Sequence, residues 1–148
     1  MKVMGIELDS NRLNYVIVAR SLPEEANVVA SGKLQLEGTR DADALRAFAR
    51  ECRELFKDQS PDAISVKAKP ESGQMRAGAA ALKMEAVIMA QSTCPVYFFT
   101  SQQMKSVDDN SELYAYQQGA WKAAVTGFEP PTKKAPRATK KNTRGKQG

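Results

Sequence analysis

The sequence of 148 residues contains no histidine. Ser/His/Asp and Cys/His catalytic groups need an imidazole to move a proton, so enzymes of these two types are excluded. Zinc sites that use histidine as a ligand are excluded as well, because that ligand is missing. The missing residue type therefore removes several enzyme classes before any motif is considered.

Cysteine is scarce, since Cys52 and Cys94 are the only two in the sequence. Both lie in apolar segments without CxxC spacing, a pattern typical of reduced core thiols rather than of a disulfide or a metal site. The sequence also lacks a signal-peptide pattern and any apolar run near the roughly 18 residues of a membrane span. We therefore expect a cytoplasmic protein with no membrane partner.

Acidic residues are missing from the end of the chain. The segment from Pro131 to Gly148 holds seven Lys and Arg residues and no acid, whereas the rest holds 15 basic and 17 acidic residues. The formal net charge of +5 therefore belongs to the tail. Large apolar residues are absent from Thr132 onward, and Pro130 and Pro131 stop regular structure. We predict one folded domain at residues 1–128 and a disordered basic tail at residues 129–148.

Apolar patterning predicts five strands and three helices. The turn-forming tetrapeptide Asp9-Ser10-Asn11-Arg12 indicates a hairpin between the first two strands. The first helix runs from an N-cap at Asp41 to about Lys57, and the second spans Ala79–Ala90. The order βββαβαβα predicts an α/β fold with a mixed five-stranded sheet flanked by helices. The predicted strands are Lys2–Leu8, Leu13–Arg20, Asn27–Leu36, Ala63–Val66 and Pro95–Thr100.

The last predicted helix ends near Val125. Asp109 and Glu112 form an acidic variant of a capping box ahead of it. It carries an apolar stripe at helical spacing, which we expect to pack in the core. The stripe consists of Leu113, Tyr116, Ala120 and Ala124, with Trp121 close by.

The predicted element order is that of the ribonuclease-H-like fold, and three stretches resemble the RuvC-type Holliday-junction resolvases of that superfamily. Gly5-Ile6-Glu7 resembles their first-strand Gly-Ile-Asp, and Ala81-Leu82-Lys83-Met84 resembles their Ala-Leu-Lys-Leu. Val96–Lys105 resembles their strand that leads into a polar helix start. The chain resembles more closely, over most of residues 1–126, the uncharacterised bacterial domain-of-unknown-function family 3010. That resemblance lies in the Cys/Met-Gly-Ile-Glu-type opening and in Lys83-Met84-Glu85-Ala86.

Active enzymes of this superfamily gather three or four carboxylates from the first strand, the fourth strand and the final helix around two Mg²⁺ ions. The resemblance places Glu7 at the first-strand position, and Asp9 follows on the same face of the strand. The fourth-strand position falls on Lys67 or a neighbour, and the final helix has only Glu112 nearby. We therefore predict that Lys67 pairs with Glu7 where a metal would lie. In the simpler interpretation Glu7 is a strand-end carboxylate and Asp9 a turn residue.

Two groups of basic residues are candidates for nucleic-acid binding. The first lies on or beside the loop after the fourth strand, which faces nucleic acid in RuvC-like proteins: Lys67, Lys69, Arg76 and Lys83. The second lies in the tail, where contacts with phosphates would be salt-dependent: Lys133, Lys134, Arg137, Lys140 and Lys141. The alternatives are a solvated loop and a solubilising tail.

Three functions follow as hypotheses. The favoured one is a RuvC-like protein that has lost catalysis, needs no cofactor and binds DNA or RNA. The second is an active Mg²⁺-dependent nuclease with Glu7 and Asp9 as catalytic residues, Glu7 as a metal ligand, and Glu85 or Asp108 and Asp109 in a rearranged site. The third is a protein-interaction module, because a fold does not imply a function. RuvC-like resolvases work as dimers, so a homodimer is one candidate assembly.

Overall fold

A five-stranded mixed sheet forms the centre of the computed structural model, which describes residues 1–22, 25–70, 72–74 and 76–131. The predicted tail lies outside the described residues from Thr132 onward. Strands and helices follow in the predicted order. They are β1 (Lys2–Asp9), β2 (Arg12–Ala19), β3 (Asn27–Gln35), α1 (Ala42–Gln59), β4 (Ala63–Lys67), α2 (Ala79–Gln91), β5 (Val96–Phe99), the 3₁₀ helix η1 (Ala115–Gln117) and α3 (Gln118–Thr126).

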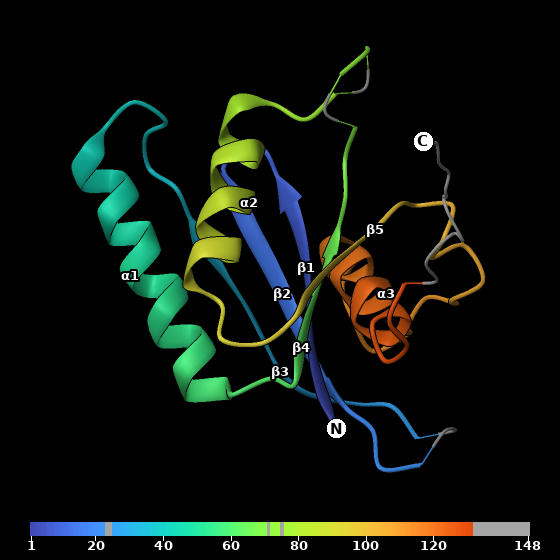
Figure 1. Ribbon diagram of the computed structural model, residues 1–148. Coiled ribbons are helices and arrows are strands. Elements are labelled where there is room, and N and C mark those ends of the chain that lie inside the picture. Colours follow the sequence, from blue (N-terminus) through green and yellow to red (C-terminus); the bar gives the residue numbers. More distant parts are fainter. Residues whose placement is uncertain (23–24, 71, 75, 132–148) are drawn as a thin grey trace, which may run out of the picture.

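The strands lie side by side in the order β3-β2-β1-β4-β5. The first three form an antiparallel meander, and β4 and β5 each pair in parallel with the strand before them in the sheet. Helices α1 and α2 cover one face of the sheet and α3 covers the other (Figure 1). The three layers confirm the predicted mixed sheet flanked by helices.

Side chains alternate between the two faces of β1. Met4 and Ile6 point into the larger core, between the sheet and the α1–α2 layer. Val3 points into the second core, where it packs with Ala120 and Trp121 of α3. Every second residue of β1 therefore faces α3. Only these residues of the strand can take part in a site on that side of the sheet.

The first two helices confirm the sequence prediction within about two residues at each end. Asp41 is the N-cap of α1, and its carboxylate accepts hydrogen bonds from the backbone N–H groups of Asp43 and Ala44. The longest described helix is α1, and its buried residues Phe48, Cys52 and Phe56 lie on one side. No helix in the described ranges is both long and apolar enough to cross a membrane.

The last helix differs from the prediction, because regular helix begins only at η1 and α3 rather than after Glu112. The carboxylate of Asp109 pairs with Lys122 instead of capping a helix. The predicted apolar stripe is also only partly correct. Ala120, Ala124 and Trp121 are buried, but Tyr116 is 44% exposed.

Both cysteines are free thiols, as the sequence predicted. Burial, and to a smaller extent the charge of Glu51, raises the pKa of Cys52 from 9.0 to about 12. Burial and Asp62 also raise the pKa of Cys94, which is only partly buried. A raised pKa lowers the thiolate fraction at neutral pH, and the thiolate is the reactive form.

We expect an aromatic disulfide reagent at pH 8 to react with one thiol per folded chain, at Cys94, and with two after unfolding. Cys52 is fully buried, and a thiol with a pKa of about 12 is ionised in roughly one molecule in 10,000 at this pH. The measurement is the absorbance of the released thiolate with and without denaturant. Loss of the native signal in Cys94→Ser identifies the reacting group, and rapid titration of two thiols in the folded chain would contradict the buried position of Cys52.

Candidate functional site

A row of polar side chains crosses the sheet on the face that α3 covers. Glu7 of β1 is paired with Asn14 of β2, and Asn14 is paired with Lys33 of β3. Lys67 at the end of β4 lies on the other side of Glu7. Directly paired residues on neighbouring strands place their side chains on the same face of a sheet. The register therefore brings two lysines, an amide and a carboxylate into one line.

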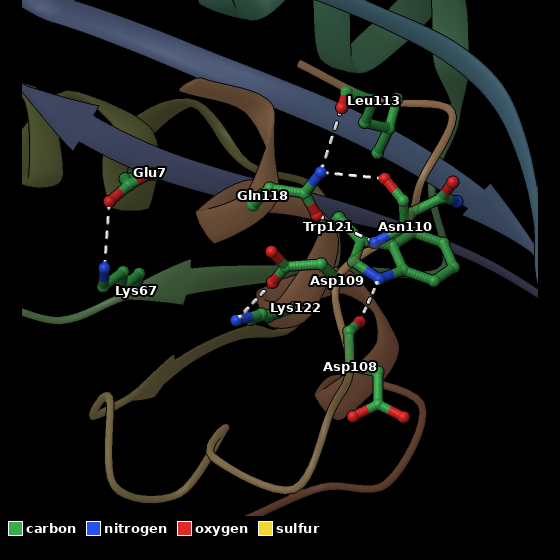
Figure 2. Close-up of polar contacts among 9 residues, drawn as sticks. All are labelled: Glu7, Lys67, Asp108, Asp109, Asn110, Leu113, Gln118, Trp121 and Lys122. Carbon is green, nitrogen blue, oxygen red and sulfur yellow. Dashed lines mark hydrogen bonds and ion pairs between the residues drawn. The ribbon is translucent and has the colours of Figure 1, made fainter. Parts of the chain in front are cut away.

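Glu7 and Lys67 form an ion pair at the centre of this row. The ammonium of Lys67 donates a hydrogen bond of 3.0 Å to Oε2 of Glu7. The side chains are 21% and 27% exposed for Glu7 and Lys67, so the pair is partly shielded from water. Figure 2 shows the two groups pointing toward each other from adjacent strands. The predicted pairing of these two residues is confirmed.

The absence of a side chain at Gly119 lets the Glu7 carboxylate lie against α3. A Cβ atom built at Gly119 would collide with the carboxylate, including Oε2 at 2.8 Å. A larger residue at position 119 would have to push Glu7 away from its present place. In the first turn of α3, backbone atoms of Gly119 therefore lie next to the Glu7 carboxylate, and no acidic side chain does.

Three lysines line a cavity of about 610 Å³ that also contains Glu7 in its lining. Lys67 comes from β4, Lys105 from the segment after β5, and Lys122 from α3. The acidic residues of the lining are Glu7 and Asp109, so cations outnumber acids. The ammonium of Lys122 lies 2.8 Å from Oδ1 of Asp109, while Lys105 is exposed. We call this cavity the lysine cleft.

The segment before α3 is held against the helix by side chains of α3 itself (Figure 2). The Gln118 amide donates hydrogen bonds to the backbone carbonyls of Asn110 and Leu113 and accepts one from the Asn110 N–H. The indole of Trp121 donates to the Asp108 carbonyl at 3.0 Å. These contacts give a segment without regular structure a defined position at the edge of the lysine cleft.

The other predicted acidic residues do not join Glu7. Asp9 pairs with Arg12 across the hairpin at 3.4 Å, and its side chain is 58% exposed. Glu85 lies on α2, which covers the opposite face of the sheet. Asp109 lines the lysine cleft but pairs with Lys122, and Asp108 does not line it.

The predicted basic residues are dispersed as well. Lys67 lines the lysine cleft, whereas Lys83 donates to the backbone carbonyl of Thr39 on the α1–α2 side. Lys69 lines a different, mostly apolar pocket beside Glu85. Arg76 donates to the carbonyl of Gly73 within its own loop. The tail residues lie outside the described part of the chain: Lys133, Lys134, Arg137, Lys140 and Lys141.

Sequence reasoning missed several residues of the cleft, among them Lys105, Gly119 and Lys122. A glycine inside a predicted helix was an available signal, because glycine is unfavourable there unless something approaches the backbone closely. Lys122 follows Gly119 by three residues and therefore lies on the same helix face. Lys105 had no comparable signal, because its segment has no periodicity.

These residues do not suit the Mg²⁺ site that the resemblance implies. Hard divalent cations need several oxygen ligands, and within the described ranges no three Asp, Glu, Cys or His residues are grouped to hold a metal. The ammonium of Lys67 already occupies one oxygen of Glu7, and two further lysines line the cleft. A cation entering here would meet positive charge at the positions where it needs ligands.

The comparisons with known proteins agree with this fold. The chain superimposes on RuvC from Thermus thermophilus with a TM-score of 0.69 at 15% identity, over 85% of this chain and 92% of RuvC. The T. thermophilus RuvC in complex with a Holliday junction substrate gives 0.65 at 16% identity, over 85% of this chain and 91% of that one. At these identities the likeness concerns the fold alone.

Searches of curated protein sequences find no match to the chain. A family model, in contrast, matches residues 1–127, which is most of the chain. The model is described as a protein of unknown function, DUF3010, the family that the opening motif and the Lys83–Ala86 stretch had indicated. The chain belongs to the DUF3010 family and has a RuvC-like fold.

Proposed function

We propose that this protein binds nucleic acid in the lysine cleft and does not cleave it by a metal-dependent mechanism. The observation that carries the proposal is the ion pair between Glu7 and Lys67 at 3.0 Å. In a two-metal nuclease the first-strand carboxylate has to be free to hold a cation. Here a fixed ammonium neutralises that carboxylate.

Charge in the cleft supports a polyanionic ligand. Lys67 and Lys122 each have one acidic partner, and Lys105 adds an exposed cation to the lining. Phosphates could contact all three ammonium groups with release of counterions. The RuvC fold also holds a Holliday junction substrate in T. thermophilus, so a sheet and helix arrangement of this kind can accommodate DNA. The basic tail would add affinity without sequence preference.

The test is a binding titration of the full chain and of a chain that ends at Pro131, with duplex, branched, single-stranded and RNA oligonucleotides. Each titration is run at two salt concentrations, with and without Mg²⁺. We expect binding by both proteins that weakens with salt, a steeper salt dependence for the full chain, and no cleavage. Truncation removes seven positive charges and leaves the cleft unchanged.

Two outcomes would overturn the proposal. Mg²⁺-dependent cleavage that disappears in Glu7→Ala would support an active nuclease. Undetectable binding to all substrates at low salt, together with a specific co-purifying protein, would support a protein-interaction module instead.

We expect Lys105→Glu in the truncated chain to weaken binding about fivefold or more and to reduce the salt slope by about one. Lys105 lines the cleft and is exposed, so the substitution changes charge there without removing a buried contact. Arg50→Glu is the matched control, because Arg50 is an exposed residue of α1 on the other side of the sheet. Fluorescence anisotropy with one labelled oligonucleotide measures both variants. Equal losses in the two variants would show that net charge, and not the cleft, determines affinity.

A further inference from the structure

Two tyrosines stand exposed beside the lysine cleft. The Tyr114 side chain is 73% exposed and that of Tyr116 is 44% exposed. Their rings are stacked, with centroids 6.1 Å apart and planes inclined by 6°. Aromatic rings normally contribute to a core or an interface, so a parallel pair left in water indicates a binding surface.

Hydrogen bonds of the neighbouring Gln117 hold the segment that carries the two tyrosines in place. Oε1 of Gln117 accepts the Tyr114 backbone N–H at 2.9 Å. The amide nitrogen of the same glutamine donates to Oγ of Ser31 on β3 at 3.3 Å. Gln117 itself is buried. The two tyrosines are therefore anchored to the edge of the sheet before any ligand arrives.

Positive charge continues from the cleft to this pair. Ala115, between the two tyrosines, lines the lysine cleft, as does Leu113. Lys33, at the end of the polar row, places its ammonium 4.8 Å from the centroid of the Tyr116 ring. A nucleic-acid strand leaving the cleft at Ala115 would thus meet a flat aromatic surface and a further cation.

We propose that Tyr114 and Tyr116 form a stacking platform for an unpaired nucleobase, with Lys33 and the lysine cleft holding the adjacent phosphates. The inference rests on the proposed function and adds a ligand class to it: a strand with at least one base outside a duplex. Stacking on an aromatic ring requires a free base face, which paired and stacked bases inside a duplex do not offer. The platform would contact every base similarly, so it selects for strand state rather than for sequence.

The test uses the full chain with two oligonucleotides of equal length and charge, oligothymidylate and an abasic strand. We expect Tyr114→Ala to lower affinity for oligothymidylate by about five- to 150-fold, because a stacked base is worth about 1–3 kcal/mol. Affinity for the abasic strand should not change. Tyr114→Phe keeps the ring and should bind oligothymidylate like the original protein. Fluorescence anisotropy at about 150 mM salt, where exposed charges are screened beyond about 8 Å, limits the contribution of the tail.

The outcomes separate this inference from the proposed function. Unchanged binding of both strands by Tyr114→Ala, or equal affinity of the original protein for the two strands, would overturn the platform and leave the lysine cleft standing. No binding to any strand would overturn both. Because Tyr114 is exposed and loses only its contact with Tyr116, the variant should unfold within a few degrees of the original protein, and a thermal melt checks this.

Discussion

Gly5→Ala is expected to lower the free energy of unfolding by about 3 kcal/mol or more, and the melting temperature by roughly 10 °C. Gly5 lies on the face of β1 that α3 covers. A Cβ there would collide with the backbone carbonyl of Ala120, and would lie 2.5 Å from the Ala124 nitrogen and 2.8 Å from its Cβ. Backbone atoms of a buried helix cannot rotate away as a side chain can. Helix α3 would have to move off the sheet, and the lysine cleft would lose its shape.

Gly78→Ala is the control for this substitution. Gly78 is the N-cap of α2, with φ of −74°, and a Cβ there meets no atom within 4 Å. We expect a change of no more than about 1 kcal/mol, because alanine is a poorer N-cap than glycine but meets no steric conflict there. Urea unfolding followed by circular dichroism compares the variants under one condition. Similar stabilities for Gly5→Ala and Gly78→Ala would contradict the close packing of α3 on β1.

The second large effect is expected from the Glu7–Lys67 ion pair. Lys67→Met alone should reduce stability, since it leaves the Glu7 carboxylate partly buried without its partner. Glu7→Gln alone should also reduce stability, since it leaves the Lys67 ammonium partly buried without its acidic partner. The double substitution should lower the free energy of unfolding by less than the sum of the two single substitutions. The difference is the coupling energy, which we expect to be about 1–3 kcal/mol. This lies between the values typical of exposed and of fully buried pairs, because both side chains keep about a quarter of their surface.

The pair between Arg46 and Asp43 supplies the comparison. Its contact distance is also 3.0 Å, but the two side chains are 72% and 95% exposed. The same double-mutant cycle should give little or no coupling, since water screens exposed pairs. Chemical denaturation of the four proteins in each cycle measures both energies. Equal coupling energies in the two cycles would show that the Glu7–Lys67 pair is no stronger than an exposed ion pair. This result would contradict the partly buried ion pair in the lysine cleft.

Sequence reasoning predicted the elements whose signal is local. Alternating apolar residues gave the strand positions, and the order of strands and helices gave the mixed sheet. It also predicted the Glu7–Lys67 pair, because the family resemblance placed the two residues at positions that share one metal site. It failed at the start of the last helix. There Asp109 had two available partners, the backbone N–H groups of a helix and Lys122, and only packing selects between them.

The sequence by itself determined the absence of histidine chemistry, the segregation of positive charge into the tail, and a carboxylate and an ammonium at or beside the ends of two predicted strands. The tertiary structure alone brought Lys105 and Lys122 to the same cleft, placed Gly119 against Glu7, and left Tyr114 and Tyr116 exposed at its edge. The physical reason is distance along the chain. A segment without periodicity takes its position from contacts with residues far away in sequence, as Gln117 does with Ser31, and such contacts exist only once the sheet and α3 have packed together.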